Sequence, residues 1–129
     1  MKNKILIIDD NPTDVKILSR LLGVKDYELI VAYEGLDGFE KAKRENPDLI
    51  FLDLTMPKMD GHMVCKLLKS DKKCQRTPII MLTGSLDAED KEWGFKTGAD
   101  AYLQKPIQQN ELFETLKKLL ENKKDQCNS

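Results

Sequence analysis

The chain has 129 residues, of which 40% are hydrophobic and 33% are charged, and this length suits one domain. The composition is typical of a soluble globular protein and excludes an intrinsically disordered chain, and the apolar runs are too short for a membrane span. The net charge of −1 argues against a nucleic-acid-binding surface across the domain, and the opening residues lack the long apolar region of a signal peptide.

Short apolar runs alternate along the chain with amphipathic segments. A run of four apolar residues between polar or turn residues is typical of a strand buried on both faces of a parallel sheet. In chain order we expect a strand at 5–8, a helix between Asn11 and Gly23, a strand at 29–32, a helix marked by Leu36, Phe39 and Ala42, a strand at 49–52, a helix carried by Val64, Leu67 and Leu68, a strand at 79–82, a helix over 88–97, a strand at 101–103, and a helix carried by Leu112, Leu116, Leu119 and Leu120.

The ends of the first helix carry clear signals. Asn11 can cap it, Pro12 suits its first position, and Asp14 is favourable near its positive end. Gly23 is expected to end it.

Strict alternation of strands and helices predicts parallel strands joined by right-handed crossovers. The fold class is therefore α/β: one doubly wound, five-stranded parallel sheet with helices on both faces. We expect the domain to occupy residues 1–121, followed by a polar C-terminal tail over 122–129 that frays.

Polar side chains with chemical capability follow four of the predicted strands. Asp9 and Asp10 follow the first strand, Asp53 the third, Thr83 the fourth, and Lys105 comes shortly after the last. Because chemistry in an open parallel sheet gathers beyond the carboxyl ends of the strands, we expect these residues to meet at one edge.

Three carboxylates brought close together repel one another, so the site requires a neutralising cation. Oxygen ligands favour a hard divalent ion, and Mg²⁺ fits because it takes one or two carboxylates and keeps positions open for water and phosphate oxygens. Lys105 adds a second positive charge, and the Thr83 hydroxyl suits binding of a phosphoryl oxygen. Asp53 stands alone on its strand and is the best candidate for a nucleophile that attacks phosphorus.

With these residues in place, the chain resembles the receiver domain of two-component response regulators over essentially its whole length. The matching segments are Ile-Ile-Asp-Asp-Asn at 7–11, Leu-Asp-Leu-Thr-Met-Pro-Lys-Met-Asp-Gly at 52–61, Ile-Met-Leu-Thr-Gly at 80–84 and Gly-Ala-Asp-Ala-Tyr-Leu-Gln-Lys-Pro at 98–106. The resemblance implies a flavodoxin-like sheet with strand order 2-1-3-4-5.

The resemblance also implies roles for individual residues. Asp53 would accept a phosphoryl group, and Mg²⁺ would be held by Asp9 or Asp10, Asp53 and the backbone carbonyl of Thr55. Lys105 and Thr83 would contact the acyl phosphate.

The implied response to phosphorylation is a conformational switch. Tyr102 would turn inward when Thr83 moves, and the Lys105–Pro106 peptide bond would be cis.

The implied partners are a sensor histidine kinase or histidine phosphotransfer protein, which would supply the phosphoryl group, and a downstream effector protein. A dimer could form on phosphorylation, and neither direct nucleic-acid binding nor membrane association is expected. Such a domain is a signalling phosphoacceptor in a phosphorelay, which assists its own phosphorylation and dephosphorylation, rather than an enzyme.

Three other functions fit parts of the pattern. A Mg²⁺-dependent aspartyl-phosphate phosphatase would carry a second aspartate two residues after Asp53, where Thr55 stands. A flavin-binding module would need a Ser/Thr/Gly-rich loop after the first strand, where Asp9 and Asp10 would repel phosphate. A receiver-like module used only for protein contacts usually lacks one of the site residues, whereas this set is complete.

Simpler roles compete for individual residues. Asp9 and Asp10 could help to cap a helix, Thr83 could close a turn, Lys105 could be a surface charge, and Tyr102 could be a core aromatic without a switching role. His62 is expected at the surface.

The cysteines give a simple expectation about redox state. Cys65, Cys74 and Cys127 are odd in number and form no Cys-x-x-Cys pair, so we expect free thiols and a cytoplasmic location.

Overall fold

The computed structural model describes residues 3–23, 27–54, 61–84 and 98–127. At its centre is a five-stranded sheet with the order β2-β1-β3-β4-β5, and every neighbouring pair is parallel. The strands are β1 (Asn3–Ile8), β2 (Tyr27–Ala32), β3 (Leu49–Asp53), β4 (Ile79–Thr83) and β5 (Ala101–Gln104). Both the predicted strand set and the order implied by the family resemblance are confirmed.

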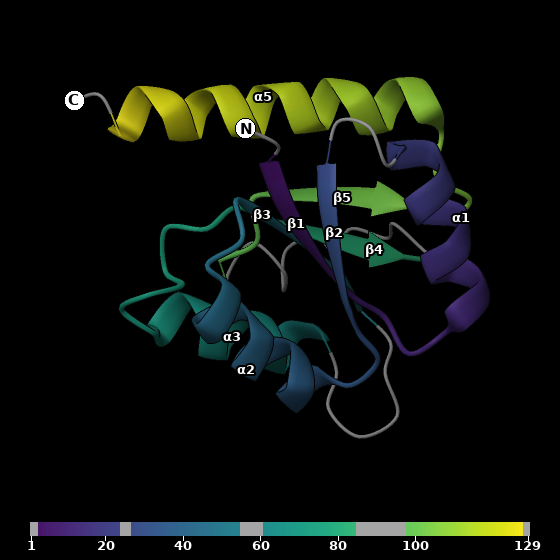
Figure 1. Ribbon diagram of the computed structural model, residues 1–129. Helices are drawn as coiled ribbons and strands as arrows, with labels where there is room; N and C mark the ends of the chain where they lie inside the picture. Colours follow the sequence, from purple (N-terminus) through teal and green to yellow (C-terminus); the bar gives the residue numbers. More distant parts are fainter. Residues whose placement is uncertain (1–2, 24–26, 55–60, 85–97, 128–129) are drawn as a thin grey trace.

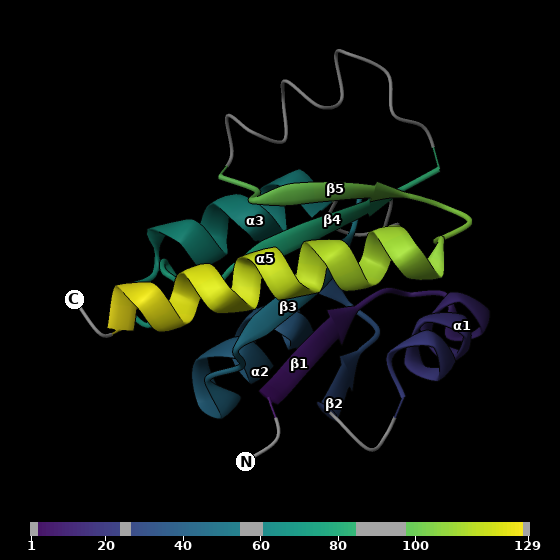
Figure 2. The same ribbon diagram turned by 90° about the horizontal axis from the view of Figure 1, so that it is seen from above.

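Helices cover both faces of the sheet (Figures 1 and 2). They are α1 (Pro12–Leu22), α2 (Gly35–Glu45), α3 (Gly61–Ser70) and α5 (Gln109–Cys127). Helices α1 and α5 lie on one face, and α2 and α3 lie on the other. The helix expected over 88–97 falls outside the described residues. None of the helices that the structure describes is both long enough and apolar enough to cross a membrane.

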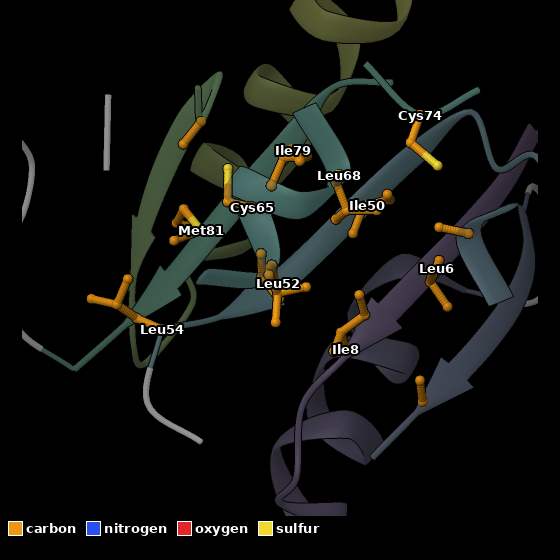
Figure 3. Close-up of a cluster of buried hydrophobic side chains, with 14 residues drawn as sticks. Leu6, Ile8, Ile50, Leu52, Leu54, Cys65, Leu68, Cys74, Ile79 and Met81 are labelled. Atoms are coloured by element: carbon orange, nitrogen blue, oxygen red, sulfur yellow. The ribbon is translucent and has the colours of Figure 1, made fainter. Parts of the chain in front are cut away.

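Alternate residues of the central strands supply two cores, one on each face, because successive strand side chains point to opposite sides. On the α2/α3 face, Leu68 of α3 lies beside Ile50 of β3 (Figure 3). This cluster contains Leu6, Ile8, Ala32, Ala42, Ile50, Leu52, Leu54, Val64, Cys65, Leu68, Cys74, Ile79, Met81 and Ala99. On the other face, the strands pack against α1 and α5. That cluster contains Ile5, Ile7, Val15, Leu18, Leu22, Leu49, Phe51, Ile80, Leu82, Leu103, Leu112, Leu116 and Leu119.

Helix α1 begins and ends at the expected residues. The Asn11 side chain accepts hydrogen bonds from the backbone N–H groups of Thr13 (2.9 Å) and Asp14 (3.4 Å). Gly23 ends the helix with φ of 79°, a conformation that costs glycine little. The Asn11 cap fixes the first turn of α1 directly after β1.

Small residues form the most buried positions of α2. Leu36, one of the residues that mark this helix in the sequence, is 58% exposed, whereas Gly38 is buried. A Cβ atom on Gly38 would lie 2.5 Å from Cδ1 of Ile8, so the missing side chain allows α2 to approach β1 closely. Phe39 of the same helix is partly buried against the core of the α2/α3 face, beside the buried small residues.

The last helix is longer than expected. It continues past residue 121 to Cys127, into the segment expected to form a polar tail. The fraying expected of this segment stays a prediction. Residues 122–127 include neither proline nor glycine, so nothing in this segment interrupts a helix.

Two of the three cysteines lie in the core of the α2/α3 face. Cys65 and Cys74 are both free and buried, as predicted for free thiols. Burial raises the pKa of the Cys74 thiol, and the nearby Asp71 carboxylate raises it further. The Cys74 thiol therefore stays protonated and packs as a small apolar group of the core.

Candidate functional site

The register of the sheet brings the predicted residues to one edge. Ile8 of β1 is paired with Leu52 of β3, so the residues that follow, Asp9 and Asp53, lie at the same level. On the other side of β3, Asp53 is paired with Leu82, so Thr83 comes one residue later on β4. Thr83 is in turn paired with Gln104, and Lys105 follows. The predicted meeting of strand ends is confirmed.

Three carboxylates form a compact cluster at this edge. Oxygen atoms of Asp9, Asp10 and Asp53 all lie within 4.8 Å of one another. Asp9 is 1% exposed and Asp53 is 6% exposed, whereas Asp10 is exposed. The backbone N–H of Asn11 donates to Oδ1 of Asp9 at 3.0 Å, which holds this carboxylate in the turn between β1 and α1.

This donor set fits a hard divalent cation. All three groups offer carboxylate oxygens, and the cluster contains no thiol or imidazole that would favour a softer metal. One face of the cluster is exposed through Asp10, so water could complete the coordination shell. The fourth ligand implied by the resemblance, the carbonyl of Thr55, lies outside the described residues.

Lys105 supplies the positive charge of the site. Its Nζ atom lies 3.3 Å from Oδ2 of Asp9, 3.4 Å from Oδ1 of Asp53 and 2.8 Å from Oδ2 of Asp14. Burial lowers the pKa of Lys105, but the hydrogen bond to Asp14 and the charges of Asp53 and Asp9 outweigh burial, so the pKa lies above its ordinary value. The side chain is therefore an ammonium ion at physiological pH.

Asp14 was not predicted as part of the site. From the sequence it is only a favourable charge in the first turn of α1, yet it makes the shortest of the three contacts to Lys105. The missed signal is its position: it is the third residue of a helix that starts directly beyond the carboxyl end of β1.

Thr83 and Tyr102 lie on adjacent strands. Thr83 is buried at the end of β4, and its backbone carbonyl accepts a 2.7 Å hydrogen bond from the backbone N–H of Lys105. Tyr102 is partly buried against the core of the α2/α3 face. The Lys105–Pro106 bond is cis, as the resemblance implied. The roles of Thr83 and Tyr102 in switching stay predictions.

The start of α3 packs directly on the end of β3. The backbone N–H of Gly61 donates to the carbonyl of Leu54 at 2.9 Å. The next residue, His62, is only 8% exposed, so the expectation that it lies at the surface is wrong. This close approach of α3 to the strand end buries Gly61 and His62, and the polarity of histidine alone does not indicate such burial.

Comparison with known sequences agrees with this architecture. The chain is 40% identical over 117 residues to the DNA-binding dual master transcriptional regulator RpaA of Synechocystis. This alignment covers 91% of the chain and 48% of RpaA. It is also 33% identical over 117 residues to protein PilH of Pseudomonas aeruginosa, covering 91% of the chain and 97% of PilH. The chain thus spans about half the length of some curated relatives and nearly all of another.

Solved structures give the same result. Chemotaxis protein CheY4 of Vibrio cholerae matches with a TM-score of 0.87 and 31% identity, covering 92% of this chain and 99% of that one. The receiver domain of a sensor histidine kinase from Pseudomonas aeruginosa PAO1, with a magnesium ion coordinated in its active-site cleft, matches with a TM-score of 0.86 and 26% identity. That match covers 94% of this chain and 99% of the other.

The family model of the response regulator receiver domain matches residues 5–117. This range includes every strand end described above together with the acidic cluster and Lys105. The chain belongs to the receiver domains of response regulators.

Proposed function

We propose that this receiver domain is a phosphorylation switch in which Asp53 accepts a phosphoryl group from a phosphohistidine on a sensor histidine kinase or a histidine phosphotransfer protein. The observation that carries the proposal is the position of Asp53, which lies at the end of a central strand between an acidic cluster and the Lys105 ammonium.

The proposed transfer is a simple displacement at phosphorus. A carboxylate oxygen of Asp53 attacks the phosphorus atom, the P–N bond to the donor imidazole breaks, and its electron pair leaves with the ring nitrogen. Lys105 stabilises negative charge on the phosphoryl oxygens, and the Thr83 hydroxyl binds one of them.

The proposed cofactor is Mg²⁺, held by Asp9, Asp10, Asp53 and the backbone carbonyl of Thr55. When bound, it supplies positive charge that neutralises the carboxylates and the incoming phosphoryl oxygens. The compact all-oxygen cluster and the magnesium ion in the similar P. aeruginosa receiver domain support this assignment.

The proposed output is a change in the surface that includes β5 and α5. Phosphorylation would bias a pre-existing balance between two conformations, in which Thr83 and then Tyr102 change position. A downstream effector protein, or a second copy of the domain, would bind one conformation better. The proposal includes a receiver unit over residues 1–121, and a cytoplasmic location that the free thiols of Cys65 and Cys74 support.

The direct test uses phosphoramidate, a small donor with a P–N bond, and intact-protein mass spectrometry. With Mg²⁺ we expect a gain of one phosphoryl group, which is lost in Asp53→Asn and in the presence of a chelator. Asp37→Asn is the control, because Asp37 is a helix-start aspartate that pairs with Lys41 on α2. A mass gain that persists in Asp53→Asn would exclude Asp53 as the acceptor.

The same reaction separates the switch from the alternative phosphatase. Both would form an aspartyl phosphate, but a phosphoacceptor holds it long enough to accumulate as the phosphorylated chain, whereas a phosphatase hydrolyses it at once and releases inorganic phosphate. Turnover of the donor with no detectable phosphorylated chain would therefore contradict the proposed function.

A further inference from the structure

Lys105 is shared between two kinds of carboxylate. Asp9 and Asp53 belong to the cluster that fits a divalent cation, whereas Asp14 stands outside that cluster. The ammonium nevertheless lies closest to Asp14, at 2.8 Å, compared with 3.3 Å to Asp9 and 3.4 Å to Asp53. An ammonium has three N–H donors, and these three carboxylates can accept all of them.

The position of Asp14 is set by the backbone. It is the third residue of α1, and the Asn11 side chain accepts a hydrogen bond from its backbone N–H. The positive end of the helix stabilises its carboxylate. Asp14 is therefore a fixed charge at the side of the site, and its side chain is 31% exposed.

Lys105 and a divalent cation would compete for the same two carboxylates. A cation bound by Asp9 and Asp53 would lie near an ammonium that already contacts both, and the two positive charges would repel each other. Without another carboxylate partner, the Lys105 ammonium would either stay and weaken cation binding by repulsion, or move into solvent and leave the site.

The structure offers space beside the ammonium. A cavity of about 340 Å³ adjoins it, lined by Asp9, Asp14, Ile17, Leu82, Lys105, Pro106 and Ile107. Lys105 therefore has room to move away from Asp9 and Asp53 while it keeps its 2.8 Å contact with Asp14.

We propose that Asp14 is a positioning residue, which holds the Lys105 ammonium beside the acidic cluster and so frees Asp9 and Asp53 to bind a divalent cation. The proposal rests on the metal site of the proposed function and adds a residue that regulates its affinity. Asp14 raises cation affinity while it keeps Lys105 within reach of a phosphoryl group on Asp53.

The test measures the dissociation constant of Mg²⁺ by isothermal titration calorimetry, without any phosphodonor. Asp14→Asn keeps the shape of the side chain and removes its charge, and we expect Mg²⁺ binding to weaken about three- to tenfold. Asp14→Glu, which keeps the charge, is expected to restore most of the affinity.

Asp37→Asn is a matched control. Asp37 is the third residue of α2, and it pairs with Lys41 at 3.1 Å, so the substitution removes the same kind of helix-start ion pair at another place. We expect it to change Mg²⁺ affinity by less than about twofold.

A second variant, in which Lys105 is replaced, tests whether Asp14 acts through the lysine. Lys105→Met removes the competing ammonium and is expected to strengthen Mg²⁺ binding. Adding Asp14→Asn to this variant should then change the affinity by less than about twofold. An equal loss with and without Lys105 would mean that Asp14 acts only as a distant charge, which would overturn the proposal.

The outcomes distinguish this inference from the proposed function. If the unmodified protein binds Mg²⁺ and Asp14→Asn binds it equally well, the role of Asp14 is wrong and the phosphorylation switch is unaffected. If the unmodified protein binds no Mg²⁺, the metal site itself is wrong and both proposals fail.

Discussion

Gly61 shows how tightly the strand that carries Asp53 is enclosed. A Cβ atom at this position would lie 2.5 Å from the backbone oxygen of Asp53 and 2.8 Å from Cα of Leu54. Both neighbours are backbone atoms, which cannot rotate away as a side chain could. Glycine at position 61 is therefore a condition for α3 to start beside the site.

We predict that Gly61→Ala lowers the free energy of unfolding by about 1 to 3 kcal/mol, because the added methyl group forces the end of β3 and the start of α3 apart. Urea unfolding followed by circular dichroism measures the change. Gly84→Ala is the control, since a Cβ atom at that position would have nothing within 4 Å among the described residues, and its stability should change by less than about 0.5 kcal/mol. Equal losses in the two variants would refute the steric explanation.

At the level of single residues, the sequence indicated those site residues whose positions are set by the end of a strand. Asp9, Asp53, Thr83 and Lys105 could be predicted to meet because each follows a strand, and parallel strands end at one edge. The contact of Asp14 with Lys105 could not, because it depends on the direction in which α1 leaves the sheet.

At the level of elements, one lysine connects three of them at the opposite edge of the sheet. Nζ of Lys69, on α3, donates to the carbonyl of Thr77 at 2.9 Å and to Oδ2 of Asp100 at 3.1 Å. The same Asp100 oxygen accepts the backbone N–H of Ile79 at 2.8 Å. The end of α3, the start of β4 and the residue before β5 are thus held together by a partly buried charge pair.

We predict that Lys69→Met lowers the free energy of unfolding by about 1 to 2 kcal/mol, because it removes charge-assisted hydrogen bonds and leaves their acceptors without the ammonium. Urea unfolding again provides the measurement. Lys66→Met, at an exposed position on the same helix, is the control and should cost less than about 0.5 kcal/mol. If Lys66→Met costs as much, the loss reflects the helix rather than this connection.

The positions of the strands could be predicted well from the sequence, whereas the residues that each helix buries could be predicted less well. Uninterrupted apolar runs such as the one at 79–82 can only be accommodated between two covering layers, so burial on both faces could be inferred. The face that α2 turns inward depends on Gly38 fitting against Ile8, and hydrophobicity favours Leu36 instead. A pattern of apolar residues does not show where small residues such as glycine pack closely against a strand.

At the scale of the whole molecule, the acidic cluster links stability to metal binding. Three carboxylates within 4.8 Å of one another destabilise the metal-free fold, and any cation that binds only the folded chain stabilises it to a degree that grows with its concentration. The unfolding midpoint should therefore rise with Mg²⁺ at constant ionic strength.

We predict that Asp10→Asn stabilises the metal-free protein by about 0.5 to 1 kcal/mol, because it removes one of the mutually repelling charges, and that it reduces the stabilisation gained from Mg²⁺. Thermal unfolding with a chelator and with saturating Mg²⁺ measures both effects. Glu114→Gln, on the exposed surface of α5, should show neither. A metal-free Asp10→Asn protein that is less stable than the unmodified one would contradict this account of the cluster.

The topology could be inferred from the sequence because alternation permits few arrangements, and the order of strands came from family resemblance. The end of α5 could not be inferred in the same way. A polar segment without proline or glycine is compatible with either a helix or a tail, and the helix continues to Cys127.

The late position of Lys105 in the chain constrains how the protein can be synthesised. The carboxylates that surround its ammonium are 96, 91 and 52 residues earlier in the chain, so they emerge from the ribosome well before it. The leucines of α5, which close one of the two cores, emerge later still. A nascent chain that stops short of β5 therefore has an acidic sheet edge without its counter-charge and an apolar face without its cover. Translation must deliver nearly the whole domain before its native structure becomes the most stable one.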